Sequence, residues 1–381
     1  MIKGDKMKIV DDYFLKKVDR VSFVQLKKGT KIEIGNYTIK EDIPLPIVTT
    51  TLIEEIKEGH IEEELKVSYI IDGAIYILGI DIDFKHKNEY KKILYNYNPD
   101  IEGYILFKGF QFVKEDNLDS GAIFFRALAG LNPENIEGLF NYALSLENIG
   151  KNFIDLGHKD KGEAFLIEST SQLEGILDID INYPLAYYKL GYHYKYYEQF
   201  QKAKLIWEKY LTLDKEEERV QEIREQVEII EDDAKFEEGI NYITKGHYQE
   251  ALDNLIPLSY KHKKWWNIFY LVGLAYKGIG EYEEAIDYFY EALNLEGTDV
   301  NIYNELGICL FSLGDIQEAI NIFNQGIDQD DTDYRIIFNR GLAYFKLGLV
   351  DKGKEDIKAA YILNPNDRVV GNYMKQLETY Y

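Results

Sequence analysis

Few residues in this chain have the type and spacing for catalysis or metal binding. Asp81, Asp83 and His86 lie close together in sequence, and two carboxylates beside an imidazole are a ligand set that divalent ions accept. The same three residues also suit a polar turn that caps a following helix. The six histidines form no H-x-x-x-H or H-E-x-x-H pair. We therefore favour the polar turn and expect no metal, no cofactor and no enzymatic activity.

Composition excludes further classes of site. The single cysteine, Cys309, excludes a disulfide framework and a Cys-type zinc site. Its repeat position, described below, carries Ala275 and Ala343 in sister segments, which indicates a small buried residue rather than a nucleophile. The formal net charge of -23 opposes binding to nucleic acid or to an anionic membrane. The longest uncharged run, 265–276, is shorter than a membrane span, and the N-terminus has no apolar signal region, so we expect a soluble cytoplasmic protein.

Small and aromatic residues recur with a period of 34. The positions that keep this spacing are Gly273, Gly307 and Gly341, then Gly280, Gly314 and Gly348, then Ala285, Ala319 and Gly353, and lastly Phe289, Phe323 and Ile357. Several positions sharing one period indicate a repeat array. The pattern, and the segment LVGLAYKGIGEYEEAIDYFYEALNL in particular, is similar to the tetratricopeptide repeat. The resemblance implies a helical hairpin in each unit.

The periodicity agrees with this resemblance on physical grounds. Small residues at positions 8 and 20 of a unit let two helices approach, large residues fill the space around them, and Gly at position 15 ends the first helix. Units begin near 102, 136, 184, 232, 266, 300 and 334. We therefore predict a mainly α fold, a right-handed α-solenoid of seven clear hairpins and an eighth degenerate one, with a small β-containing N-terminal segment.

Two units are 14 residues longer than the period. In the second unit we expect a longer first helix and a loop from Gly157 to Gly162 to take up the excess. In the third unit the addition is 216–231, where apolar residues spaced by three and four predict an amphipathic helix. This segment should run on into the next unit as one continuous helix over 217–244. Together the long units should divide the array into an N-terminal and a C-terminal part.

The remaining segments complete the predicted domain organisation. Residues 1–47 carry short β-branched and aromatic runs around Gly29 and Gly35, which predict a small β-rich domain built as a meander, with a linker over 41–46. Residues 48–101 form a helical connector, with a short helix near Thr50–Glu58 and a degenerate repeat. Within it, residues 65–80 suit a helix or a β-hairpin, and we favour the helix. The solenoid spans 102–367, and 368–381 form a capping helix.

In proteins with this repeat, positions 2, 5, 6, 9 and 12 of the first helix line the concave groove. Mapped onto this chain, the resemblance implies a ligand-binding face made of Tyr188, Tyr192, Phe236, Asn267, Tyr270, Asn301, Asn304, Arg335, Phe338 and Asn339. Aromatic anchors with Asn side chains suit a peptide backbone. The carboxylate clamp of some family members is not kept, because Tyr270, Leu274 and Glu305 replace three of its Lys and Asn residues.

We therefore expect a non-enzymatic scaffold that binds a peptide or partner protein in the concave groove, with no nucleic-acid or membrane partner. A second hypothesis is a peptide-responsive bacterial regulator that uses the array as a sensor, since its length resembles that of peptide-pheromone receptors built on this repeat. A third is an enzyme with a site in the N-terminal segment around Asp81, Asp83 and His86.

Overall fold

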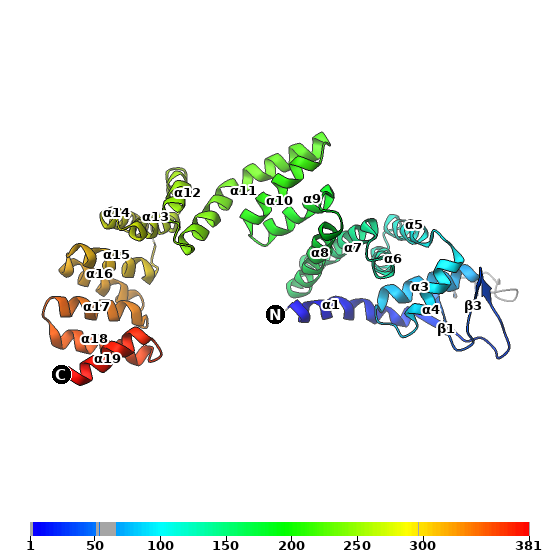
Figure 1. Cartoon of the computed structure of the whole chain (residues 1–381), viewed down its shortest axis with the longest axis horizontal. Coiled ribbons are helices and arrows are strands. Elements are labelled where there is room, and N and C mark those ends of the chain that lie inside the picture. The colour runs from blue at the N-terminus through cyan, green and yellow to red at the C-terminus, as the bar shows by residue number, and fades with distance from the viewer. Residues whose placement is uncertain (1–2, 51–52, 54–65, 296, 381) are drawn as a thin grey trace. The chain divides into compact units, whose positions relative to one another are not determined.

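The computed structural model describes residues 3–50, 53, 66–295 and 297–380. The chain forms two compact units, which we describe separately (Figure 1). Unit 1 comprises residues 1–198 and 205–223, and unit 2 comprises 199–204 and 224–381. Two helices contribute residues to both units, α10 (Phe200–Leu213) and α11 (Glu217–Thr244).

The described part of unit 1 starts with a helix, which the prediction of a small β-rich domain built as a meander did not include. The elements are α1 (Lys3–Leu15), the 3-10 helix η1 (Lys16–Arg20), β1 (Val21–Val24), β2 (Glu33–Ile34), β3 (Tyr37–Thr38) and β4 (Leu45–Val48). β2 pairs with β3, but β1 pairs with β4 in a separate two-stranded sheet. The predicted meander is therefore wrong beyond the β2–β3 hairpin, and part of the predicted linker is strand β4.

Side-chain packing explains why α1 forms. Val10 and Phe14, four residues apart on one helix face, are both buried. The ring of Tyr13 meets Phe165 of α8 (Lys159–Ile179) edge-on, with centroids 5.1 Å apart, and its hydroxyl donates to Asp119. The buried residues of the N-terminal segment belong to the same hydrophobic core as those of the following helices.

The next segment is helical, which settles the alternative at residues 67–80. It contains α3 (Val67–Ile80) and α4 (Lys87–Tyr97), and ten residues of α3 are buried. The β-hairpin interpretation is wrong because α3 is covered on several sides, by β4 and by α6 (Leu118–Leu131) of the first repeat. The helix predicted at Thr50–Glu58 lies almost wholly outside the described residues.

Within the described residues the seven predicted hairpins are present. Besides α10 and α11, their helices are α5 (Ile101–Lys114), α6 (Leu118–Leu131), α7 (Ile136–Asp155), α8 (Lys159–Ile179), α9 (Pro184–Tyr196), α12 (Tyr248–Lys261), α13 (Trp266–Ile279), α14 (Tyr282–Asn294), α15 (Val300–Leu313), α16 (Ile316–Gln329), α17 (Tyr334–Lys346) and α18 (Val350–Leu363). The predicted capping helix is α19 (Arg368–Tyr380). In unit 2 each helix from α13 to α19 packs on the one before it (Figure 1).

Glycine at position 8 allows the two helices of a hairpin to touch. A Cβ added at Gly307 would lie 2.2 Å from the ring of Phe323, and one at Gly273 would lie 2.7 Å from the ring of Phe289. Both distances are shorter than van der Waals contact, so only glycine fits beneath these rings. At position 15, Gly314 ends α15 with a φ of 94°, the left-handed conformation that the sequence predicted for the turn.

The two long units differ from each other. In the second unit α7 has 20 residues and α8 has 21, against 14 each for α5 and α6. The predicted loop at Gly157–Gly162 is therefore wrong, because α8 already begins at Lys159 and Gly162 lies inside it beside Gly150 of α7. In the third unit the predicted continuous helix is confirmed, since α11 runs over Glu217–Thr244 without interruption.

Candidate functional site

The ten residues predicted to line the groove are divided between the two units. Tyr188 and Tyr192 lie on α9 in unit 1, and the other eight lie on α11, α13, α15 and α17 in unit 2. The predicted residues therefore belong to two faces, one in each unit.

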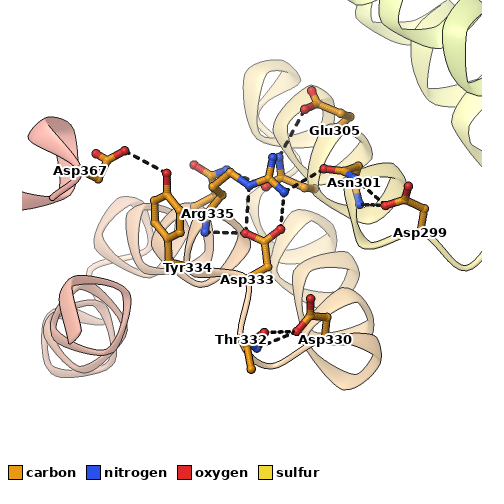
Figure 2. A network of polar contacts seen from close by, with 11 residues as sticks. Asp299, Asn301, Glu305, Asp330, Thr332, Asp333, Tyr334, Arg335 and Asp367 are labelled. Atoms are coloured by element: carbon orange, nitrogen blue, oxygen red, sulfur yellow. Dashed lines mark hydrogen bonds and ion pairs between the residues drawn. The ribbon is translucent and has the colours of Figure 1, made fainter. Parts of the chain in front are cut away.

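Four of the predicted residues form a polar ladder between α15 and α17. We use this name for Asn301, Asn304, Arg335 and Asn339. Arg335 Nη2 donates to Oδ1 of Asn301 at 2.9 Å, and Asn339 Nδ2 donates to Oδ1 of Asn304 at 2.8 Å. The partners are 34 and 35 residues apart, so one repeat period places the same face of successive first helices side by side. Figure 2 shows Arg335 reaching toward Asn301.

Two aspartates fix the N-terminal end of the ladder. Asp299 and Asp333 precede α15 and α17, and their Oδ1 atoms accept from the backbone N–H groups of Asn301 and Arg335, each at 2.9 Å. Asp333 also accepts two hydrogen bonds from the Arg335 guanidinium, which raise the pKa of that group (Figure 2). The cap therefore holds the arginine in place and balances its charge.

The second cation of this face is paired as well. Lys277 of α13 donates to the Glu305 carboxylate on α15. Nearby, burial and then the negative charge of Glu305 raise the pKa of Tyr270, so its hydroxyl stays protonated at neutral pH. Lys277 and Arg335 are thus compensated by carboxylates of the chain, and this face offers hydrogen-bonding groups more than net charge.

An open apolar cavity of about 900 Å³ lies at the C-terminal end of unit 2. We call it the C-terminal groove. It is lined by Phe311, Leu342, Phe345 and Lys346 of α15 and α17 and by Tyr373, Gln376 and Leu377 of α19. Phe311 and Phe345 were not among the residues predicted from the sequence. Both stand at position 12 of their units, where two earlier units carry Lys195 and Lys277. This change from Lys to Phe is the sequence feature that could have indicated the groove.

Three of the predicted residues, Phe338, Phe236 and Asn267, do not belong to the polar ladder. The ring of Phe338 is buried and meets Tyr373 edge-on, with centroids 5.3 Å apart, so it joins α17 to α19. Phe236 packs against the buried cluster formed by α12 and α13. Asn267 is half-buried near the start of α13, and among the described residues it takes part in none of the ladder's hydrogen bonds.

In unit 1, Tyr188 and Tyr192 converge on one carboxylate. The Tyr188 hydroxyl donates to Glu222 of α11 at 3.0 Å, and the Tyr192 hydroxyl donates to the same residue. Burial, with this carboxylate as a further cause, raises the pKa of both tyrosines. The inserted helical segment thus supplies a partner for both hydroxyls.

The other candidates from the sequence are the acidic residues and histidine around α4 and the single cysteine. Asp81 follows the end of α3, and its side chain accepts from the backbone N–H of Asp83 at 3.0 Å, while His86 precedes α4. The described residues contain no group of three or more His, Cys, Asp or Glu side chains placed to hold a metal. Cys309 is buried, as predicted, and burial raises the pKa of its thiol to about 12.

The helical hairpins and their period define an α-solenoid repeat protein. Family models agree in the C-terminal part, where residues 267–331 and 334–367 each match the tetratricopeptide repeat. The C-terminal part of the chain therefore consists of tetratricopeptide repeats. No curated protein is significantly similar to the chain in sequence.

Several solved structures of repeat proteins are similar to the chain. A tetratricopeptide repeat protein from Parabacteroides merdae is 16% identical, with 72% of this chain and 97% of that one covered and a TM-score of 0.35. YrrB, described as having an unusual peptide-binding site, is 19% identical over 66% and 97%, with a TM-score of 0.28. The first repeat domain of Spaghetti (RPAP3), bound to an HSP90 peptide, is 20% identical over 30% and 90%, with a TM-score of 0.29.

At these TM-scores the likeness carries no information about what this chain binds. Among the residues that the structure describes, no helix has both the length and the apolarity that crossing a bilayer requires.

Proposed function

We propose that this protein is a non-enzymatic scaffold that binds a peptide segment of a partner protein in unit 2, along α15 and α17. Tetratricopeptide repeat proteins are in general interaction scaffolds without catalytic activity. The observation that carries the proposal is the C-terminal groove, which continues on α17 from the polar ladder. Arg335, Asn339, Leu342 and Phe345 follow one another at helical spacing, so one helix face changes from polar to apolar along its length.

The chemistry of this face suits an uncharged, partly apolar peptide. Asn339 and Asn301 offer amide groups that can donate to and accept from a peptide backbone. Phe311 and Phe345 supply apolar area at the other end, where aromatic anchors contribute most of the binding energy in protein interfaces. Because Arg335 is already paired with Asp333, we expect little preference for an acidic peptide.

A display experiment tests this proposal. The full chain is immobilised, peptides are selected from a random display library, and their affinity is measured by fluorescence anisotropy. Phe345→Ser removes an anchor from the C-terminal groove, and we expect it to weaken the selected peptides about tenfold or more, equivalent to about 1.4 kcal/mol. Selected sequences should be rich in apolar residues.

The matched control is Ile362→Ser, which makes the same kind of change on the exposed side of α18, where the side chain is 78% exposed. This variant should bind as the unaltered chain does. If Phe345→Ser binds as tightly as Ile362→Ser while both remain folded by circular dichroism, the assignment of the groove is wrong.

A further inference from the structure

A second, smaller cavity lies in unit 1 and is a consequence of the long second repeat. It has a volume of about 170 Å³ and is lined by Glu147, Lys151, Ile154, Asp155, Leu166, Tyr192, His193, Tyr196 and Tyr197. We call it the His193 pocket. Three of these residues, Lys151, Ile154 and Asp155, lie on α7 beyond Gly150, the position at which shorter units turn. The extension of α7 therefore builds one wall of the pocket.

His193 occupies a position that the three C-terminal units keep small. Aligned units carry Ala275, Cys309 and Ala343 at the same place in their first helices, and all three are buried. His193 is also buried, with only 5% of its surface exposed. A buried imidazole where packing needs only a methyl or thiol group calls for an explanation beyond the repeat itself.

The hydrogen bonds of Thr170 determine which ring nitrogen of a neutral His193 carries the proton. Thr170 Oγ1 donates its one proton to the Leu166 carbonyl at 2.8 Å, and it also lies 2.8 Å from His193 Nδ1. Since its proton is used, Thr170 must accept from Nδ1–H. In the neutral imidazole, Nε2 is therefore a bare acceptor, and within the described residues it has no hydrogen-bond partner.

A second acceptor faces the first. Oε2 of Glu147, a residue that is 5% exposed, lies 3.7 Å from His193 Nε2 and has no hydrogen-bond partner among the described residues. Its charge is nevertheless balanced, because Lys189 Nζ lies 3.0 Å from Oε2 and Lys151 donates to Oε1.

A third buried polar atom completes the set. The hydroxyl oxygen of Tyr197 is buried without a hydrogen-bond partner in the described part of the chain. The pocket therefore presents two acceptors 3.7 Å apart and one hydroxyl that can donate, in surroundings that include Leu166 and the tyrosine rings. A buried polar atom left without a partner destabilises the folded state, so the bare His193 Nε2 and the Tyr197 hydroxyl, beside the Glu147 carboxylate, favour a ligand that meets all three groups together.

We propose that the His193 pocket binds a neutral primary carboxamide, the group at the end of a glutamine or asparagine side chain. Its NH₂ group has two protons, one for His193 Nε2 and one for Glu147 Oε2, and its carbonyl oxygen accepts from the Tyr197 hydroxyl. The ligand is neutral because Lys151 and Lys189 already balance the Glu147 charge. A carboxylate lacks the N–H donors, and an ammonium group would add a positive charge beside two lysines. The volume matches a group of side-chain size.

Ligand-observed NMR and calorimetry on the full chain test the proposal. The probes are N-acetyl-glutamine-N-methylamide and its glutamate and methionine counterparts, which have nearly the same size. We expect the glutamine probe to bind at least about tenfold more tightly than either of the others. His193→Ala, which installs the residue found in sister units, should keep the fold and remove that difference, and Glu147→Gln should weaken binding in the same direction. His247→Ala, at an exposed histidine of unit 2, is the matched control.

A further comparison of two ligands identifies the source of the amide. Binding of a glutamine-containing peptide about tenfold tighter than propionamide assigns the group to a partner's side chain, and equal affinity assigns it to a small free amide. The proposal is overturned if none of the probes binds, which would leave the pocket to ordered water. It is also overturned if the three blocked amino acids bind alike, or if His193→Ala keeps the preference for glutamine. None of these results depends on peptide binding in unit 2.

Discussion

The carboxylate of Glu89 ties the strand segment of unit 1 to helix α4. It accepts a hydrogen bond from the Tyr37 hydroxyl of β3 and contacts Lys92 Nζ at 3.1 Å and Lys40 Nζ at 3.3 Å. These contacts, that of Tyr37 first, lower the pKa of Glu89 to about 2. A pKa below its unfolded value means that the ionised side chain stabilises the folded state.

The sign of the pH dependence follows from this shift. The stabilisation is complete above the ordinary pKa of about 4.5 and is lost as the pH falls through about 2. Tyr37→Phe removes the main cause of the shift, so the free energy of unfolding of the variant should fall less than that of the unaltered chain between about pH 5 and about pH 2.5. Urea denaturation at each pH measures the difference.

Tyr260→Phe is the control for this comparison, because Tyr260 is 71% exposed. It should leave the pH dependence as it is in the unaltered chain. If the free energy of unfolding of Tyr37→Phe changes with pH as much as that of Tyr260→Phe, the hydrogen bond to Glu89 does not contribute to the pH dependence.

At the residue scale, the sequence predicted which repeat positions share the helix face that carries the polar ladder. Asn301 and Arg335 could be found because each occupies position 2 of its unit, and one period places them in contact. Phe311 and Phe345 follow the same rule but were not singled out. The α19 lining of the C-terminal groove has no counterpart in other units, and the orphaned acceptor on His193 depends on the hydrogen bonds of Thr170, which no spacing reveals.

At the scale of the element, the close contact between the helices of a hairpin is the feature that forms the array. Gly307→Ala would place a Cβ 2.2 Å from the Phe323 ring, so we expect a loss of about 1 to 3 kcal/mol in the free energy of unfolding. Gly175 of α8 has open space around an added Cβ, and Gly175→Ala should instead stabilise the chain by about 0.5 to 1 kcal/mol. Chemical denaturation of the pair measures both. Equal effects would contradict the steric explanation.

Elements without a repeat partner were harder to predict. Helix α1 mixes charged and apolar residues over 13 positions, and it forms because Val10 and Phe14 are buried in the core of unit 1. Strand β4 contains Pro46, whose ring prevents a backbone N–H from donating, which suggested a linker. The strand is nevertheless tolerated because it belongs to a two-stranded sheet, where half of its backbone groups need no ladder partner.

At the scale of the whole molecule, the two compact units should unfold as distinct steps. Their buried residues form separate clusters, one around α3 to α8 and others within α12 to α19. A substitution in one unit should therefore lower the stability of that unit alone. Gly109→Ala places a Cβ 2.5 Å from Phe125 in unit 1, and Gly307→Ala is its counterpart in unit 2.

Differential scanning calorimetry with hydrogen exchange checks this prediction. Gly109→Ala should shift a transition in which amides of unit 1 lose protection, and Gly307→Ala should shift one that belongs to unit 2. A single transition that moves by the same amount in both variants would show that the chain unfolds as one cooperative body.

The second repeat also has a consequence for protein engineering. Its hairpin has gained six or seven residues in each helix, or about two turns per helix. Both helices of the hairpin therefore lengthen together, and the base of the hairpin keeps the spacing of its neighbours. Growth has occurred at the tip, where Leu156 is 73% exposed and Gly157 turns the chain with a φ of 81°. A fluorescent protein or affinity tag inserted after Gly157 should therefore leave the array intact, so this tip is a suitable site for an internal label.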